Sequence, residues 1–186
     1  VYGDSKGNWV NENTSPNPQQ ERSIRRFSCE KQWLDTKLPI QILRLPGIYG
    51  PGRSAFESLL NGTTKMIDKP GQVFSRIHVD DIAGSVLFLI NLFFQGRTPS
   101  VVNIADNLPA NNLDVLNFAA KIAKKSLPST VPFEIAQKTM SPMALSFWQE
   151  NRKVDNELLC KKLGYSLIYP DFRSGLKSCF SQLKIN

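Results

Sequence analysis

The sequence predicts an α/β protein in which short strands alternate with helices. Three short apolar runs, at residues 39–45, 73–79 and 101–105, have the length and composition of strands. A helical repeat of apolar residues follows each of the last two runs, and it is clearest in the helix that starts at Asn112. This alternation, rather than any single segment, indicates the α/β class.

The amino-terminal segment is rich in turn-forming residues and leads into a helix. Glycine, asparagine and proline recur through the first 20 residues. A helix is then predicted from about Gln19 to Leu34, with Ile24, Phe27 and Trp33 at its apolar positions.

A glycine-rich loop separates the next strand from the next helix. The strand at 39–45 enters the loop 46–53, and a short helix is predicted over 54–60. Gly62 is expected to end this helix in the left-handed conformation that glycine adopts without strain.

A histidine and two aspartates stand between the second strand and a long apolar helix. Asp80 or Asp81 is expected to cap this helix, which runs to about Phe94 with its aromatic side chains in the core. His78 is interpreted as a structural hydrogen-bonding residue, and a role as a ligand is the alternative.

The rest of the chain is predicted to be mostly helical. Asp114 in the first turn of the helix from Asn112 and lysines in its last turn both suit the helix dipole. Residues 126–142 are predicted to be irregular, and two helices are predicted at about 156–163 and 172–183.

Composition limits the class of protein. With 186 residues and a mass of 20.9 kDa, the chain has room for one domain. Its 41% hydrophobic content is typical of a chain with a packed core. Residues 82–94, the longest mostly apolar run, are too few for a membrane helix, which needs about 20.

Charge and cysteine usage limit the partners. The net charge of +7 is spread at helical intervals without a compact basic block, so we expect no nucleic-acid binding. Solvated faces, or attraction to a small ligand that bears phosphate, explain the charge better. Three cysteines without metal-binding spacing and a single histidine indicate a reducing cytoplasm and no metal site.

The loop at 46–53 is the first candidate for a ligand site. Three glycines and two prolines directly follow the carboxyl end of a strand, where ligands bind in open α/β sheets. Glycine has no Cβ, so a planar or phosphorylated ligand could approach the backbone. The alternative is a tight connection with no further role.

Several motifs occur together in a characteristic order. They are Val1-Tyr2-Gly3, Arg44 to Gly52, Arg76 to Asp81, Val102 to Asp106, Arg152 to Val154, Lys162 to Gly164, and Tyr169-Pro170. Together they resemble the NAD-dependent epimerase/dehydratase family, within the extended and atypical short-chain dehydrogenases/reductases. The resemblance covers nearly the whole chain.

The resemblance implies both the fold of this chain and an amino-terminal segment that precedes it. It implies that residues 1–186 are the carboxyl-terminal part of a Rossmann-like, doubly wound parallel sheet that lacks its amino-terminal half. A small substrate lobe would be interleaved at about 53–75 and 126–186. Roughly 90–100 residues with the glycine-rich dinucleotide fingerprint would then precede Val1, and this chain alone would not hold NAD in the family's way.

The family's acid–base pair is replaced in this chain. Its members use a tyrosine and a lysine four residues later on one helix, and Arg22 and Arg26 occupy these places. Arginine is not deprotonated in proteins, so neither residue can move the proton, and the catalytic residues remain unassigned. Arg26 would hold a ribose or phosphate oxygen and Arg22 a substrate anion; the alternative is two solvated arginines.

Other positions are carried over from the family's motifs. Pro46, Gly47, Ile48 and Tyr49 would border the nicotinamide of NAD or NADP. Tyr2 matches a position near the cofactor, with simple packing as the alternative. Arg53, Arg76 and, from the substrate lobe, Arg152 would bind a phosphate or carboxylate of the substrate, because guanidinium groups bind such groups with two hydrogen bonds.

The resemblance implies an NAD(P)-dependent, epimerase/dehydratase-like oxidoreductase. Its substrate would be a sugar nucleotide or a similar small metabolite, and two copies of the chain would pair as a homodimer. One alternative is a non-catalytic Rossmann-like protein that binds or senses NAD(P). Another is a truncated product without activity.

Overall fold

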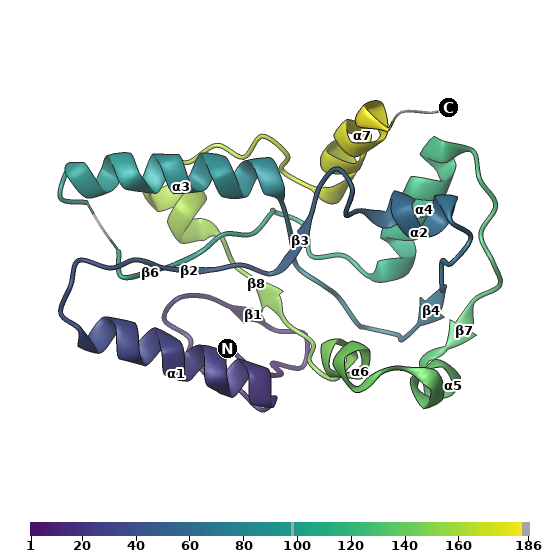
Figure 1. Ribbon diagram of the computed structural model, residues 1–186, viewed down its shortest axis with the longest axis horizontal. Coiled ribbons are helices and arrows are strands. Elements are labelled where there is room, and N and C mark those ends of the chain that lie inside the picture. The colour runs from purple at the N-terminus through teal and green to yellow at the C-terminus, as the bar shows by residue number, and fades with distance from the viewer. Residues whose placement is uncertain (98, 184–186) are drawn as a thin grey trace.

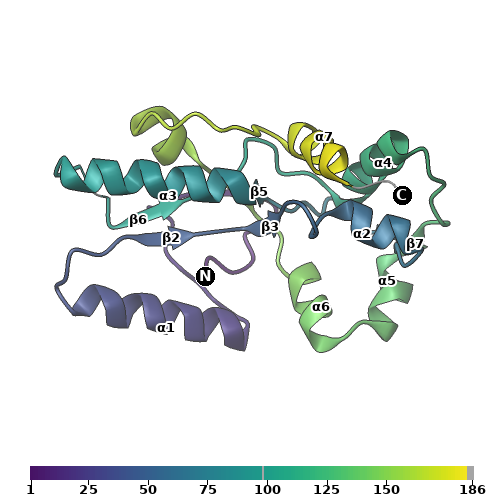
Figure 2. The same cartoon turned by 45° about the horizontal axis from the view of Figure 1, so that its top comes forward.

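The computed structural model describes residues 1–97 and 99–183, and it consists of short parallel strand pairs flanked by helices (Figures 1 and 2). In chain order the elements are β1 (Trp9–Val10), α1 (Glu21–Asp35), β2 (Ile42–Arg44), β3 (Gly47–Tyr49), α2 (Ala55–Leu60), β4 (Ile67–Asp68), β5 (Arg76–His78), α3 (Val79–Phe94), β6 (Val101–Asn103), α4 (Asn112–Ala123), β7 (Val131–Pro132), α5 (Phe133–Ala136), α6 (Pro142–Trp148), β8 (Lys153–Val154) and α7 (Phe172–Gln182). A 3-10 turn at Gln137–Thr139 and a π-helical turn at Leu158–Lys162 complete the described part.

The strand pairs are all parallel. Among the described residues β1 pairs with β8, β2 with β6, β3 with β5, and β4 with β7. Strands far apart in sequence therefore lie side by side, as parallel pairing with helical crossovers requires. The α/β class is confirmed, and the parallel pairs match a partial Rossmann-like sheet.

Three buried clusters hold the elements together. One joins α2, α4 and α7 around Phe56 and Phe172. A second packs α3 and the π-helical turn against β5 and β6. A third, smaller cluster joins Tyr2 to β1 and β8. Figure 1 shows α1 on the opposite side of the β2–β6 pair from α3. The assignment of 53–75 and 126–186 to a substrate lobe stays a prediction.

Helix α1 exists as predicted, but its buried position is not one of the predicted apolar ones. Ile24 and Trp33 are 49% and 52% exposed, whereas Glu30 is the one buried residue of the helix. The hydrophobic repeat misidentified the inner face because Glu30 is held there by an ion pair with Arg44, which periodicity does not detect.

The start of α3 also differs from the prediction. His78, not either aspartate, is the N-cap, and its Nδ1 accepts from the backbone amide of Asp80 at 3.2 Å. Asp81 is fully buried and accepts from the amides of Ile168 and Tyr169. Phe94 is 81% exposed, so the expected aromatic core of this helix ends before it.

Two segments predicted to lack regular structure contain some. Residues Gly47–Tyr49, within the predicted loop, form β3, because their backbone pairs with β5. The region 126–142 includes β7 and α5, and β7 pairs with β4. Such non-local pairing is not visible in the local sequence. The capped helices α2 and α4 and the last helix α7 lie where they were predicted, and Gly62 adopts a positive φ of 68°.

Candidate functional site

A cavity of about 870 Å³, named here the outer cavity, lies between the amino-terminal half of α1, the ends of β2, β3 and β5, and the segment from α6 to β8. Every candidate binding residue predicted from the sequence lines it. These residues are Tyr2, Arg22, Arg26, Pro46, Gly47, Ile48, Tyr49, Arg53, Arg76 and Arg152. Residues separated by up to 150 positions in the chain are thus brought to one place.

A second cavity of about 480 Å³, named the inner cavity, lies among α2, α4 and α7. Five residues line both cavities and are named here the neck: Tyr49, Arg53, Arg76, Asn112 and Trp148. This second compartment was not predicted from the sequence.

A buried ion pair forms one wall of the outer cavity. Nε and Nη2 of Arg44 donate to the same Glu30 oxygen, Oε2, at 3.1 and 2.8 Å. The side chains of Glu30 and Arg44 are only 2% and 11% exposed. The guanidinium of Arg44 also lies 4.8 Å from the ring centre of Tyr2, whose hydroxyl donates to Oδ1 of Asn103 at 2.8 Å. Burial raises the pKa of Tyr2, so its hydroxyl stays protonated at neutral pH.

Helix α1 and helix α6 meet at another side of the outer cavity. The guanidinium of Arg22 lies 3.9 Å from the ring centre of Phe147, and the Gln20 amide donates to the Gln149 side chain at 3.0 Å. Nε of Arg26, one turn along α1, is 3.6 Å from Oε1 of Glu30. Arg26 is therefore oriented toward the wall by a weak ion pair rather than by a hydrogen bond.

A second arginine–glutamate pair lines the outer cavity beyond α6. Nη1 of Arg152 donates to Oε2 of Glu150 and to the carbonyl of Gly3 at 3.0 Å. The side chain of Glu150 is 6% exposed, and its Oε1 has no hydrogen-bond partner among the described residues. Arg152 thus ties the turn at Gly3 to the segment that precedes β8.

At the neck, Arg76 has a different environment. Its Nη1 donates to the carbonyl oxygens of Phe74 and Ala110, both at 2.9 Å. Within the described part of the chain no carboxylate lies within ion-pair distance of it. Burial lowers the pKa of Arg76, and the field of Asp106 raises it.

Tyr49 belongs both to the neck and to the buried cluster of α2, α4 and α7. Its ring meets the ring of His78 edge-on with 5.1 Å between centroids, and its hydroxyl donates to the Asp171 carbonyl at 3.5 Å. Burial, followed by the fields of nearby acids, raises the pKa of Tyr49 well above its usual value. A Cβ at Gly175 would stand 2.0 Å from the Tyr49 hydroxyl, so only glycine fits there.

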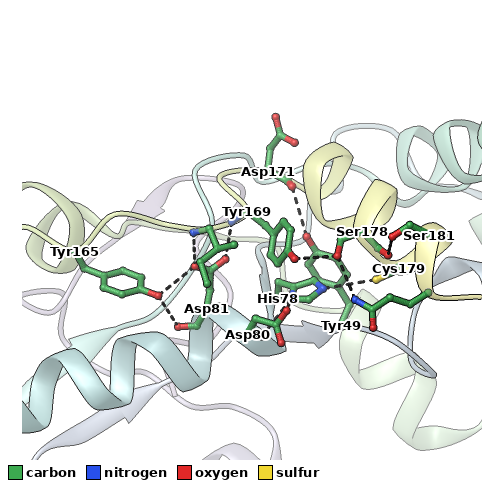
Figure 3. A network of polar contacts seen from close by, with 12 residues as sticks. Tyr49, His78, Asp80, Asp81, Tyr165, Tyr169, Asp171, Ser178, Cys179 and Ser181 are labelled. Atoms are coloured by element: carbon green, nitrogen blue, oxygen red, sulfur yellow. Dashed lines mark hydrogen bonds and ion pairs between the residues drawn. The ribbon is translucent and has the colours of Figure 1, made fainter.

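His78 and Asp81 belong to a buried network behind the neck (Figure 3). Because Nδ1 of His78 accepts from an amide, Nε2 carries the hydrogen of the neutral ring and points at Sγ of Cys179, 3.6 Å away. Burial lowers the pKa of His78 and raises that of Cys179 to about 11. Neither residue lines either cavity, and these contacts fit the structural interpretation of His78.

The described residues contain neither a metal-binding cluster nor a membrane-spanning helix. Within residues 1–97 and 99–183, no cluster of three or more histidine, cysteine or acidic side chains could hold a metal ion. None of the described helices has the length and hydropathy to cross a bilayer.

Comparison with known proteins decides the fold. No protein-family model and no curated protein matches the chain. A solved structure of a conserved protein of unknown function from Silicibacter pomeroyi is 41% identical, with a TM-score of 0.89; the match covers 97% of this chain and 63% of that one. Human epimerase family protein SDR39U1 with NADPH is 20% identical, with a TM-score of 0.76 and coverages of 98% and 62%. The chain has the fold of the NAD-dependent epimerase/dehydratase family.

Further structures agree with this epimerase/dehydratase fold. The dTDP-glucose 4,6-dehydratase from Bacillus anthracis in complex with NAD is 19% identical, with a TM-score of 0.71, and the match covers 99% of this chain and 59% of that one. These similarities confirm the resemblance inferred from the motifs. The chain spans about 60% of the length of the solved structures that it matches.

Several residues of the site were not found from the sequence. Glu150, Trp148 and Asn112 belong to no motif, and they reach the cavities only through the packing of α6 and α4. Glu30, in α1, is not among the binding residues predicted from the sequence. Its spacing of four from Arg26 was a signal for a helical ion pair, but its bond to Arg44 depends on the fold.

Proposed function

We propose that this chain is part of an NAD(P)-dependent oxidoreductase of the epimerase/dehydratase type, which acts on a sugar nucleotide or a similar small metabolite. The observation that carries the proposal is the convergence of all ten candidate residues on the outer cavity. The solved structures of this fold that contain NAD, NADPH or a nucleotide sugar add support.

The outer cavity suits a phosphorylated dinucleotide. Six arginines and two glutamates line it, which gives an excess of positive charge. Oε1 of Glu30 lies at its wall and has no hydrogen-bond donor among the described residues, and a ribose hydroxyl would supply one. Pro46, Gly47, Ile48 and Tyr49 would border the nicotinamide ring, with Tyr2 beside them, and Arg26 would bind a ribose or phosphate oxygen.

The bound cofactor would accept or donate a hydride, and the chain's own residues would bind and orient the substrate. Arg22, Arg53, Arg76 and Arg152 supply cations for its anionic groups. The raised pKa values of Tyr2 and Tyr49 keep both phenols protonated at neutral pH, so neither can act as a base without a further change.

A second candidate is a protein that binds NAD(P) without turnover. It is favoured by Arg22 and Arg26, which stand in place of the tyrosine–lysine pair and cannot release a proton. Binding without turnover would then be the complete activity of the site.

Two further features are part of the proposal. The exposed apolar side chains of α1, among them Ile24, Trp33 and Leu34, support pairing of two copies. Three free cysteines among the described residues support a reducing, cytoplasmic location.

Titration of the full-length natural protein with NADH and NADPH, followed by protein fluorescence, tests the proposal. We expect saturable binding that Arg26→Gln weakens about tenfold, the effect of one charge-assisted hydrogen bond. Arg25→Gln is the matched control, because Arg25 is 78% exposed and lies outside both cavities. Failure of both dinucleotides to bind would overturn the proposal.

Turnover distinguishes the two candidate functions. Conversion of any member of a panel of sugar nucleotides, followed by dinucleotide absorbance, would establish the oxidoreductase. Tight binding with no conversion of the whole panel would favour the protein without turnover.

A further inference from the structure

Two buried carboxylate oxygens in the outer cavity have no hydrogen-bond donor within the described part of the chain. They are Oε1 of Glu30 and Oε1 of Glu150. The other buried side-chain atoms without a partner belong to residues that line neither cavity. A buried acceptor without a donor is costly, so its presence in a cavity points to a ligand that supplies the donor. Glu30 is proposed above to bind a ribose hydroxyl, whereas the partner of Glu150 is unassigned.

The ion pair of Glu150 with Arg152 leaves polar groups of both side chains without a partner. Nη1 of Arg152 donates to Oε2 of Glu150 and to the carbonyl of Gly3. Among the described residues, Nε and Nη2 of Arg152 have no acceptor, and Oε1 of Glu150 has no donor. The side chain of Glu150 is 6% exposed and that of Arg152 is 27% exposed. The pair therefore presents a shielded acceptor beside donors that a molecule in the cavity can reach.

The backbone that carries Glu150 is held in place by buried and bridging side chains. The carbonyl of Glu150 accepts from Nε2 of Gln72 at 2.9 Å, and Gln72 is itself buried. In the next residue, Nδ2 of Asn151 donates to the Gly71 carbonyl at 2.8 Å, and Oδ1 accepts from the Val73 amide at 3.1 Å. The carboxylate is thus positioned before a ligand arrives, which lowers the entropic cost of binding.

Charge and hydrogen-bonding capacity together select the group that this pair can bind. Six arginines and two glutamates line the outer cavity, and Arg152 already balances the charge of Glu150, so an ammonium group would be repelled. An oxyanion has no hydrogen to donate to Oε1 of Glu150. A hydroxyl group both donates and accepts, so its hydrogen can bind Oε1 of Glu150 while its oxygen accepts from Arg152.

We propose that Glu150 and Arg152 together bind a hydroxyl group of the substrate, with Oε1 of Glu150 as the acceptor. The proposal rests on the proposed function, because it concerns the sugar or polyol part of that substrate. It also narrows the role of Arg152. Of the four arginines proposed for the substrate's anionic groups, Arg152 is the one with a carboxylate partner among the described residues, so its pair suits a neutral group. Glu150 then distinguishes a substrate with this hydroxyl from an analogue without it.

Calorimetric titration of the NADPH-bound full-length protein tests the proposal. The ligands are UDP-glucose, which occupies a solved structure of this fold, its analogues that each lack one sugar hydroxyl, and UDP. We expect one analogue to bind the natural protein at least tenfold more weakly than UDP-glucose. Glu150→Gln, whose single oxygen faces Arg152, should bind UDP-glucose about tenfold more weakly than the natural protein and should bind that analogue and UDP equally well. Glu157→Gln removes the same charge from an exposed position outside both cavities and should bind every ligand as the natural protein does.

Two results would overturn the proposal. One is equal binding of UDP-glucose by the natural protein and Glu150→Gln, and the other is an equal loss for UDP, which has no sugar. If Glu150→Gln does not fold, Glu150→Asp provides the test. It keeps a charge for Arg152 but shortens the side chain by one methylene, and it should weaken binding of UDP-glucose several-fold without affecting UDP.

The same titrations separate this proposal from the proposed function. If UDP-glucose does not bind, the sugar nucleotide of the panel that does bind takes its place, with its own deoxy analogues. Absence of binding by the whole panel would overturn the hydroxyl site. Normal binding of NADPH and of a sugar nucleotide without an effect of Glu150→Gln would overturn the hydroxyl site alone, whereas failure of NADPH to bind would count against the proposed function.

Discussion

Arg44 in the wall of the outer cavity and Arg76 at its neck have opposite surroundings. Arg44, on the wall, has two nitrogens on a buried glutamate oxygen. Among the described residues the guanidinium of Arg76, at the neck, donates only to the carbonyls of Phe74 and Ala110, and no carboxylate lies within ion-pair distance of it. Both arginines belong to motifs that matched the same family, and the two motifs alone do not distinguish them.

The hydrogen-bond partners of a buried arginine therefore distinguish a structural residue from one that is available to a ligand. A buried pair such as Arg44–Glu30 satisfies both charges, so removal of one partner leaves the other uncompensated. An arginine whose only partners are satisfied carbonyls contributes little to the fold and is available for an anion. Residues at binding sites often carry such a stability cost.

The largest expected effect is at the wall. Glu30→Ala should lower the free energy of unfolding by about 3–5 kcal/mol, because it leaves the guanidinium of Arg44 buried without a carboxylate. Urea denaturation followed by circular dichroism measures it. Glu21→Ala is the control: it breaks an exposed i,i+4 pair with Arg25 and should cost no more than about 0.5 kcal/mol. Similar losses for both variants would remove the distinction between buried and exposed pairs.

The buried carboxyl of Asp106, which makes no ion pair within the described part of the chain, should make the free energy of unfolding depend on pH. The pKa of Asp106 is raised from 3.8 to about 7, so the folded state holds the proton more tightly than the unfolded state. The contribution of this bound proton to the free energy of unfolding is complete below the pKa of the unfolded state and is lost as pH rises through about 7.

Asp106→Asn, which can still accept from the Leu108 amide, should remove this dependence. Relative to the natural protein the variant should gain on the order of 3 kcal/mol between pH 5 and pH 8. Denaturation across this range measures the gain. A constant difference between the two proteins at all pH values would contradict the raised pKa.

A smaller loss in the free energy of unfolding is expected from a substitution next to the neck residue Tyr49. Gly175→Ala places a methyl group against the Tyr49 ring and hydroxyl and should cost about 1–3 kcal/mol. In the Tyr49→Phe background, which lacks the hydroxyl, Gly175→Ala should lower the free energy of unfolding by less. An equal loss in both backgrounds would show that contact with the Tyr49 hydroxyl is not its cause.

The residues that line the outer cavity could be predicted from the sequence more completely than the contacts among them. The motifs at Pro46–Tyr49, Arg76 and Arg152 could be located because each is a short local pattern. The periodicity of α1 could not show that Glu30, rather than Ile24 or Trp33, is buried. The burial of Glu30 depends on its ion pair with Arg44 from β2.

The inner cavity lay beyond sequence reasoning for the same reason. Its lining comes from α2, α4, α7 and the end of α6, which are brought together by packing around Phe56 and Phe172 rather than by a motif. The capped helices were predictable because caps and turns are encoded by neighbouring residues. Strand β3 was not, because its partner β5 lies more than 20 residues further along the chain.

The most direct test of the difference between wall and neck is the free energy of unfolding of Arg44→Met and Arg76→Met, measured side by side without ligand. Arg44→Met should lose about 3–5 kcal/mol, because Glu30 is left buried without its cation. Arg76→Met should stay within about 1 kcal/mol of the natural protein, because the Phe74 and Ala110 carbonyls keep their backbone hydrogen bonds. An equal loss in both variants would contradict the account, since Arg76 would then be as structural as Arg44.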